Sequence, residues 1–240
     1  MDPISTAAAA GMRARMESLD LLANNLANAS TNGYKTDSEF YTLFSSENSS
    51  GETRLPLIKN QWTDFSQGLL TPTNEPMDFA LSGKGFFALD GPSGPLYTRN
   101  GNFRWSSAGV LENADGFAVR GVDKKPIKSQ SPQPVDVLPD GTVKQGEQML
   151  GQMELVDFPD RSVLAKQGNN YFRNADPKVL PAKADAQVQQ GRVENSNVGA
   201  AESAVRLVTV MRQFEILQKA VGMAGEMNRK AVEEVARVNP

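Results

Sequence analysis

Few residues of this sequence have a type and spacing that could do chemistry. Gly83-Lys84-Gly85 comes nearest to a phosphate-binding loop, but a P-loop needs G-x-x-x-x-G-K followed by Ser or Thr, and Gly85 and Phe86 follow this lysine. Ser82 lacks the G-x-S-x-G surroundings of a hydrolase nucleophile, and the chain has no histidine to activate it. We therefore expect a tight turn here, with Lys84 in water.

Carboxylates are the other candidates for chemistry in the middle of the chain. A pair of them could hydrolyse a glycoside, and the candidates are Asp78, Asp90, Glu112 and Asp115. No spacing selects two of the four, and none forms the D-x-D-x-D-G pattern of a calcium loop. The chain also lacks cysteine and histidine, which removes the thiolate and the commonest zinc ligand. The sequence therefore predicts no catalytic residue, no metal site and no cofactor, and it disfavours an enzyme.

The aromatic residues admit two interpretations. Trp62, Trp105, Phe86, Phe87, Tyr97 and Phe103 could stack on a sugar or on single-stranded nucleic acid. The chain has 25 basic and 28 acidic side chains and a net charge of −3, so it offers no basic stripe beside them. We interpret these residues as core and expect no nucleic-acid partner.

A long helix is expected at the amino end. Apolar residues recur at alternating spacings of three and four, which is the pattern of a helix packed on another helix, at Ala9, Met12, Met16, Leu19, Ala23 and Leu26. Pro3 suits the first turn, and Asn32-Gly33 suits a helix stop. The pattern predicts one helix from about residue 4 to about residue 31.

The carboxy end carries a second long helix with the same alternation. Its expected contact positions are Leu207, Val210, Phe214, Leu217, Val221, Ala224, Asn228, Ala231 and Val235. With Ser196 or Asn197 as N-cap, the helix covers about 198–237 and is roughly 60 Å long. We expect the two helices to pair as a coiled coil and to form one terminal domain from residues 1–44 and 192–240.

The middle of the chain predicts strands and turns. Short apolar runs alternate with Asp90-Gly91, Asn100-Gly101, Asp115-Gly116 and Asp140-Gly141, which favour tight hairpin turns. We place an all-β domain at 75–175. The polar stretches Ser45–Thr53 and Pro177–Gly191 are expected in a linker or extended segment over 45–74 and a linker over 176–191. The predicted fold class is α+β, with terminal helices around a central β domain.

Compartment signals are sparse. No run of eighteen apolar residues exists, so no membrane span is expected, and Met1-Asp2-Pro3 lacks the basic start of a secretory signal. Two alternatives remain open: a cytoplasmic protein, or export by a route without a cleaved signal peptide.

Four segments carry a resemblance to a known family. ANNLANASTNGYK at Ala23–Lys35 resembles the amino-terminal signature of flagellar basal-body rod and hook proteins. LSGKGFF at Leu81–Phe87 and YTRNGNFRWSSAGVLENADGFAVRG at Tyr97–Gly121 are similar to the β domain of that family, and VENSNVGAAESAVRLVTVMRQFE at Val193–Glu215 is similar to its carboxy-terminal signature. The residues that match these motifs at expected subunit interfaces are Asn24, Asn25, Leu26, Asn28, Gly33, Tyr34, Asn195, Asn197, Val198 and Phe214.

The resemblance implies a structural subunit that performs no chemistry. Family members polymerise into the hollow shaft that transmits torque from rotor to hook, with paired terminal helices inside and the β domain outside. The expected partners are copies of this chain, other flagellar rod proteins, hook-side neighbours and the flagellar type III export apparatus. The resemblance also implies a periplasmic place in the basal-body rod. FYTLF, with Phe40 and Phe44, matches the short pattern thought to be presented to the export gate.

Within the family, Thr63–Phe103 is most similar to a proximal rod subunit, and a distal rod or hook-type subunit is the alternative. Two other classes remain open: a carbohydrate-binding or enzymatic β domain with helical oligomerisation arms, and a cytoplasmic coiled-coil scaffold. On the rod interpretation, Asn24, Asn25 and Asn28 lie off the helix-pairing face and hydrogen-bond to adjacent subunits.

Overall fold

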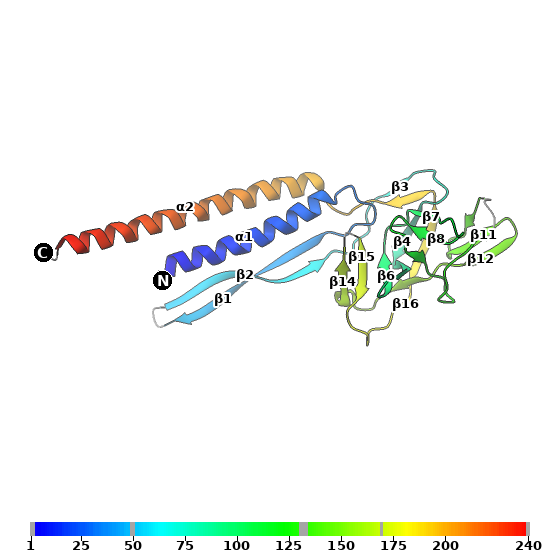
Figure 1. Ribbon diagram of the computed structural model, residues 1–240, viewed down its shortest axis with the longest axis horizontal. Helices are drawn as coiled ribbons and strands as arrows, with labels where there is room; N and C mark the ends of the chain where they lie inside the picture. Colours follow the sequence, from blue (N-terminus) through cyan, green and yellow to red (C-terminus); the bar gives the residue numbers. More distant parts are fainter. Residues whose placement is uncertain (1–2, 49–50, 130–133, 169, 239–240) are drawn as a thin grey trace. The chain divides into compact units, whose positions relative to one another are not determined.

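The computed structural model of the chain describes residues 3–48, 51–129, 134–168 and 170–238 (Figure 1). The helices are α1 (Pro3–Ala27), α2 (Ala200–Val238) and the short 3₁₀ helix η1 (Arg161–Val163). The strands up to residue 113 are β1 (Asp37–Asn48), β2 (Gly51–Thr63), β3 (Leu70–Pro72), β4 (Phe79–Lys84), β5 (Phe86–Gly91), β6 (Gly94–Thr98), β7 (Phe103–Trp105) and β8 (Leu111–Asn113). The later strands are β9 (Ala118–Val119), β10 (Asp136–Val137), β11 (Thr142–Gln145), β12 (Gln148–Gln152), β13 (Leu155–Asp157), β14 (Leu164–Gln167), β15 (Tyr171–Asn174), β16 (Ala182–Lys183), β17 (Asp185–Gln190) and β18 (Arg192–Glu194).

The chain divides into two compact units. The helical unit comprises Met1–Ala27, Asp37–Thr63 and Gly199–Pro240, and the β unit comprises Asn28–Thr36 and Asp64–Val198. The expected α+β class, with long terminal helices and a central β domain, is confirmed.

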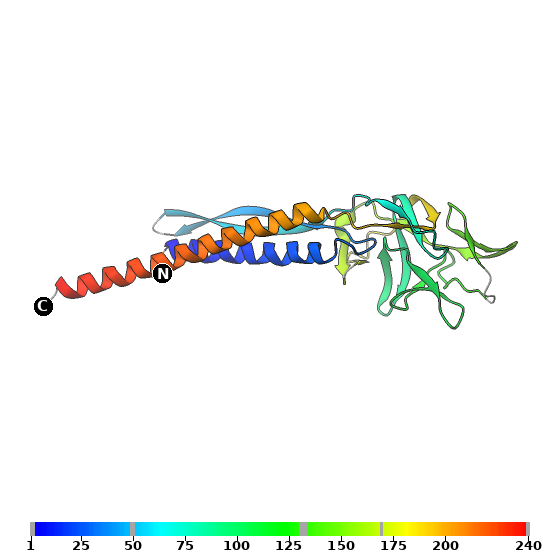
Figure 2. The ribbon, with the colours of Figure 1, turned by 90° about the horizontal axis from the view of Figure 1, so that it is seen from above.

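In the helical unit, α1 lies beside α2 on one side and beside the hairpin of β1 and β2 on the other (Figures 1 and 2). The expected contact face of α2 is buried or half-buried at its six positions from Leu207 to Ala224 but not at the seventh. Asn228 is exposed. The helix begins at Ala200, close to the expected position.

The contact face of α1 differs from the expectation. The buried positions are Ala8, Gly11, Ala14, Ser18, Leu22 and Asn25, whereas Ala9, Met16 and Ala23 of the expected face are exposed. The reason is that α1 has two neighbours: Gly11 abuts Leu217 of α2, and Ser18 Oγ donates to Glu39 of β1 over 2.6 Å. Small and polar residues suit this close packing. The helix also ends at Ala27, four residues before the predicted stop.

The hairpin of β1 and β2 corrects the loop expected at Ser45–Thr53. The two strands pair in antiparallel register from Asp37 with Thr63 to Asn48 with Gly51, with one irregularity at Phe40 and Tyr41. Polar composition did not reveal this pairing, because a two-stranded ribbon covered on one side by a helix needs few apolar residues. The compact helical unit thus takes residues that the sequence placed in a linker.

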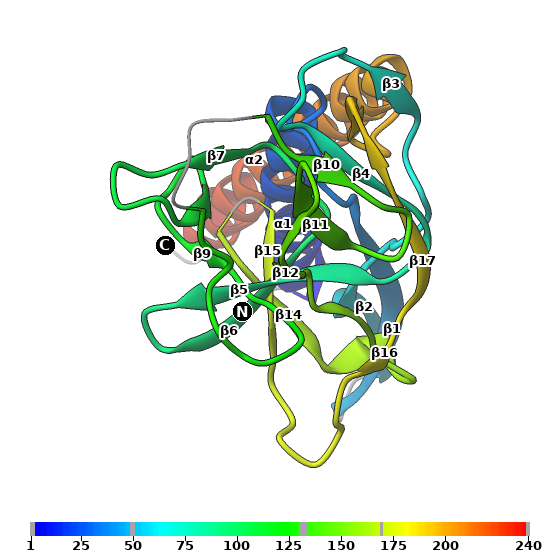
Figure 3. The same cartoon turned by 90° about the vertical axis from the view of Figure 1, so that its right-hand side faces the viewer.

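The β unit is antiparallel throughout its described pairs and has a core on each side of β5. One sheet runs in the order β14-β15-β6-β5-β9-β8-β7, and Figure 3 shows β5 between β6 and β9. Phe87 and Leu89 of β5 enter one hydrophobic cluster, and Phe86 and Ala88 enter the other. Because successive side chains of a strand point to opposite faces, the continuous apolar run in β5 fills both cores. Burying each Phe stabilises the fold by about 1.5–3 kcal/mol.

The predicted turns are confirmed at two of four sites. Gly116 and Gly141 adopt positive φ between strands that pair, β8 with β9 and β10 with β11. Asp115 and Asp140 do not, so these hairpins lack the two-residue turn with positive φ at both central positions. Gly91 instead ends β5, where it pairs with Gly94. Gly101 is not at a positive φ, and a Cβ there would overlap the carbonyl of Phe79, so close approach of the backbone explains this glycine.

The linker expected at Pro177–Gly191 is wrong for most of its second half. β17 pairs with β4 over six residues, from Asp185 with Lys84 to Gln190 with Phe79. Val188 is buried in the larger core, with Ala184 beside it. Alternating small and polar residues form this strand, which a search for apolar runs does not detect.

Candidate functional site

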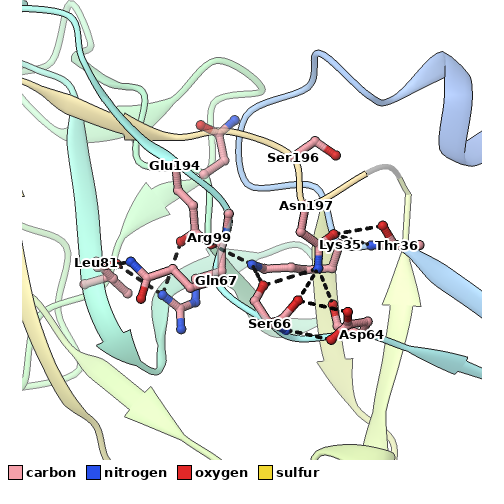
Figure 4. A network of polar contacts seen from close by, with 12 residues as sticks. Lys35, Thr36, Asp64, Ser66, Gln67, Leu81, Arg99, Glu194, Ser196 and Asn197 are labelled. Carbon is pink, nitrogen blue, oxygen red and sulfur yellow. Dashed lines mark hydrogen bonds and ion pairs between the residues drawn. The ribbon is translucent and has the colours of Figure 1, made fainter. Parts of the chain in front are cut away.

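A buried ionic network joins three distant segments of the chain inside the β unit (Figure 4). Lys35 Nζ lies 2.6 Å from Glu194 Oε1, and Arg99 Nη1 lies 3.2 Å from Glu194 Oε2. The side chains of Lys35 and Glu194 are fully buried, and that of Arg99 is 3% exposed. One carboxylate thus serves two cations out of contact with water.

Backbone carbonyls add further hydrogen bonds to the two cations. Lys35 Nζ also donates to the carbonyl of Ser66 over 2.6 Å. Arg99 donates to the carbonyls of Leu81 at 3.3 Å and Gly83 at 2.7 Å. Buried charges are tolerated only when they are paired and hydrogen-bonded. Both cations contact Glu194 and donate to backbone carbonyls, although Arg99 Nε has no hydrogen-bond partner among the described residues.

Glu194 is held from the backbone side as well. Its Oε1 accepts from the N–H of Gly68 at 2.9 Å, and its own carbonyl accepts from the N–H of Gly33 at 2.7 Å. A Cβ at Gly68 would overlap the carbonyl of Asn195. Residue 68 must therefore be glycine for its N–H to reach the Glu194 carboxylate.

Burial dominates the electrostatics of the two cations. It lowers the pKa of Lys35 below its usual value, and the charge and hydrogen bond of Glu194 oppose this change. Burial likewise lowers the pKa of Arg99, again opposed by Glu194. Glu194 is therefore the group that makes both buried charges acceptable.

Asn197 forms a second clamp between the same segments. Its Oδ1 accepts from the N–H and the hydroxyl of Thr36, at 2.8 and 2.9 Å. Its Nδ2 donates to the carbonyl of Asp64 at 2.8 Å and to Ser66 Oγ at 3.1 Å. The predicted N-cap role of Asn197 is wrong, since α2 begins three residues later and the carboxamide serves these loops instead.

Gly33 and Tyr34 place Lys35 in the network. Gly33 has φ +72°, and a Cβ there would overlap the backbone of Asn100, so only glycine fits. Tyr34 is fully buried, with Lys166 Nζ 3.9 Å from the centre of its ring. Lys166 also donates to the Lys35 carbonyl at 2.8 Å.

The expected asparagines are used differently from one another. Asn25 is buried and exchanges two hydrogen bonds with the backbone of Asp37, at 2.7 and 3.0 Å, so it fixes the start of β1 to α1 within one chain. This corrects the expectation that it faces a neighbouring subunit. Asn28 is also buried and accepts from the Thr31 hydroxyl, whereas Asn24 is exposed on α1.

The remaining predicted residues lie apart from the network centre. Asn195 donates to Thr71 Oγ1 at 3.0 Å, and Val198 lies two residues before the start of α2. Leu26 and Phe214 are half-buried in the helical unit. Phe40 and Phe44 fall in β1, and their side chains lie outside the described residues.

The residues considered for chemistry do not form a reaction site. Asp78 accepts from Asn102, and Glu112 pairs with Arg104 on the surface. Asp115 accepts from Tyr171, and Lys84 is exposed at the end of β4. Among the residues that the structure describes, no group of three potential ligands could hold a metal ion. In the same part of the chain, no helix is long and apolar enough to span a bilayer.

Comparison with known proteins identifies the family. Three family descriptions match: Flagella basal body rod protein at residues 6–35, Flagellar hook protein FlgE/F/G D1 domain at 80–145, and Flagellar basal body rod FlgEFG protein C-terminal at 189–234. The chain is 32% identical to the flagellar basal-body rod protein FlgF of Caulobacter vibrioides, covering 92% of this chain and 93% of the relative. It belongs to the flagellar basal-body rod protein family. The rod protein FlgG of Buchnera aphidicola subsp. Acyrthosiphon pisum is 30% identical over 92% of this chain and 95% of its own.

The family assignment confirms the predicted class, a structural subunit of the basal-body rod most similar to the proximal type, and not an enzyme. The ionic network connects the three segments of this rod protein that match the family descriptions. Lys35 is the last residue of the first matched segment, Arg99 lies in the second, and Glu194 lies in the third. The three segments are thus joined through one charged residue each.

This network of the rod protein was not predicted from the sequence. The motifs indicate roles for Gly33, Tyr34, Asn195 and Asn197 but none for the charged residues beside them. An internal charge leaves no periodic signal, and pairing across 159 positions between Lys35 and Glu194 cannot be inferred from local spacing. The available hint was that Lys35 and Glu194 lie inside the two signature motifs.

Proposed function

We propose that this rod protein assembles with copies of itself and with other rod and hook-side subunits into the hollow proximal shaft that carries torque from rotor to hook. The observation that supports this most is a second apolar stripe on α2. Val205, Val208, Ile216, Met223 and Met227 are 69%, 48%, 65%, 61% and 72% exposed. Their spacings of three, eight, seven and four residues return them to one side of a helix at 100° per residue.

This exposed stripe lies away from the face that α2 presents to α1. A helix that is apolar on two sides is suited to burial on both sides. α2 has 39 residues and α1 has 25, so α2 exceeds α1 by 14 residues, about 21 Å at 1.5 Å per residue. Figures 1 and 2 show α2 continuing past the amino end of α1. Neighbouring subunits would cover the exposed stripe and the extension.

The proposal extends to the pairing of the helices, the location of the protein and its export. The contact between α1 and α2 is proposed to become a coiled coil that lines the shaft, with the β unit outside. Head-to-tail contacts that do not close a ring generate an open helical assembly of this kind. We also propose a periplasmic location, reached through the flagellar type III export apparatus without a cleaved signal peptide, with Phe40 and Phe44 in the segment presented to the export gate.

The test is mass spectrometry of purified basal bodies, combined with electron microscopy of basal bodies from cells that lack this chain. The proposal expects peptides of the chain in intact basal bodies and rods that stop short in the deletion strain. Complete rods in that strain, or absence of the chain from intact basal bodies, would overturn it. Matching Phe40→Ala and Phe44→Ala variants test the export segment separately, since loss of export should leave the chain intact inside the cell.

A further inference from the structure

The methionines of the chain differ widely in exposure. Met153 is 1% exposed in the larger core of the β unit, whereas Met223 and Met227 of α2 are 61% and 72% exposed. An oxidant converts a methionine thioether to a sulfoxide where it can reach the sulfur, and this chain has no cysteine, the other side chain with an oxidisable sulfur. Exposure therefore decides which sulfur atoms of this protein are oxidised.

Met223 and Met227 lie together on the exposed stripe of α2. They are four residues apart, little more than one helical turn, so their side chains share one side of the helix. Gly11 of α1 abuts Leu217 of α2, and the two helices run in opposite directions (Figure 1). α1 begins eight residues before Gly11, and Met227 follows Leu217 by ten residues. The methionine pair thus lies near the level at which α1 begins, and α2 continues beyond it.

Oxidation by hydrogen peroxide makes such a side chain polar. The sulfur attacks one peroxide oxygen, the O–O bond breaks as the S–O bond forms, and water is released. Sulfur is oxidised by two electrons and the peroxide is reduced by the same two, so no other reactant is needed. The sulfoxide oxygen is a hydrogen-bond acceptor, and its bonds to water are lost when it is buried against an apolar surface.

The added oxygen has different consequences before and after assembly. In the monomer both side chains lie mostly in water, so the fold should tolerate sulfoxides at these positions. In a subunit contact that covers the stripe, the same oxygens are buried without partners and weaken the contact.

We propose that Met223 and Met227 form an oxidation site that controls assembly: a peroxide converts both thioethers to sulfoxides in the free subunit, and the oxidised subunit is excluded from the rod. The inference rests on the proposed burial of the stripe by neighbouring subunits. A subunit already in the rod has both sulfur atoms shielded by those neighbours. Methionine sulfoxide reductases restore the thioether, so the exclusion is reversible.

Met149 provides a matched control. It is 58% exposed on β12, so an oxidant reaches it about as readily as Met223. It belongs to the β unit and not to the stripe of α2. A polar group at Met149 should therefore leave the stripe contact unchanged.

Glutamine substitution tests the effect of polarity, because the amide carbon of glutamine stands where methionine has sulfur and carries an oxygen. The full-length Met223→Gln/Met227→Gln chain should unfold at the same temperature as the unsubstituted chain. Its amount in purified basal bodies should be lower by about tenfold or more, since each buried polar group lacks a partner. The control chains Met223→Leu/Met227→Leu and Met149→Gln should be incorporated at the normal level.

Peptide mass spectrometry of cells exposed to hydrogen peroxide tests the oxidation itself. The chain recovered from basal bodies should carry about tenfold less sulfoxide at Met223 and Met227 than the free chain of the same cells. Both exclusion of oxidised subunits and shielding in the rod lead to this difference. The glutamine chain isolates the exclusion, because its polar groups are present before assembly.

Normal incorporation of the glutamine pair, or equal loss in either control, overturns the inference and leaves the proposed function standing. Equal sulfoxide at Met223 and Met227 in the basal bodies and the free chain overturns it as well. If the glutamine pair lowers the unfolding temperature, the comparison of sulfoxide in the two pools decides. If the unsubstituted chain is missing from basal bodies, the proposed function fails first.

Discussion

Substituting Glu194 should lower the stability of the fold more than substituting Lys35, because both buried cations contact the Glu194 carboxylate. In Lys35→Met, an unbranched side chain fills the space of the lysine stem, and Glu194 keeps Arg99 at 3.2 Å and the N–H of Gly68 at 2.9 Å. In Glu194→Gln, two buried cations lose the carboxylate that both of them contact. Removing one partner of a buried pair costs about 3–5 kcal/mol, so we expect Lys35→Met at about 3 and Glu194→Gln at about 5 kcal/mol.

The assay is urea unfolding followed by the fluorescence of Trp105, which is half-buried in the β unit, in a Trp62→Phe background. The double variant should cost less than the sum of the single variants, because the two residues contact each other. At about 2–4 °C per kcal/mol, Glu194→Gln should lower the Tm by about 10–20 °C. The reasoning is refuted if Glu194→Gln costs less than Lys35→Met, or if both cost below about 1 kcal/mol, as they would at a hydrated surface.

Three further predictions concern stability of the monomer. Asn25→Ala removes two hydrogen bonds to a backbone and should cost about 1–3 kcal/mol, more than the same substitution at Asn24, which is exposed; equal values in thermal unfolding would contradict this. Gly33→Ala places a Cβ at a residue with positive φ and in overlap with the backbone of Asn100, whereas Gly116→Ala places one at a positive φ without overlap. Gly33→Ala should therefore destabilise the fold more than Gly116→Ala, and the reverse order in urea midpoints would contradict this. Since burial lowers the pKa of Lys35, the unfolded chain holds that proton more tightly, and stability relative to Lys35→Met should rise as pH increases toward 10.5; a falling difference between the two urea midpoints would reverse the sign.

The sequence predicted the long elements because their signals are local and repeated. The contact face of α2 recurs every three or four residues and was assigned correctly from Leu207 to Ala224. The apolar run of β5 likewise marked a strand. The face of α1 was misassigned because its closest contacts use Gly11, Ser18 and Asn25, which carry no hydrophobic periodicity.

Long-range pairing accounts for the other differences. β1 and β2 are polar near their turn, and β17 alternates small and polar residues, so each is recognisable only with its partner strand. The ionic network is a stronger case, since Lys35 and Glu194 are far apart in sequence. The motif residues Gly33 and Asn197 lie next to the ionic network in the sequence. The network itself depends on charged residues that are brought together only in the folded chain.

Neighbouring subunits are proposed to bury the exposed stripe of α2 in the assembled rod. The most direct measurement is maleimide labelling of a Met223→Cys chain, whose new thiol would be its only one and whose position is 61% exposed in the monomer. The account predicts rapid labelling of the purified monomer and loss of labelling in isolated basal bodies, with full labelling restored on denaturation. Equal labelling in monomer and basal bodies would show that this stripe faces water in the rod and would contradict the account.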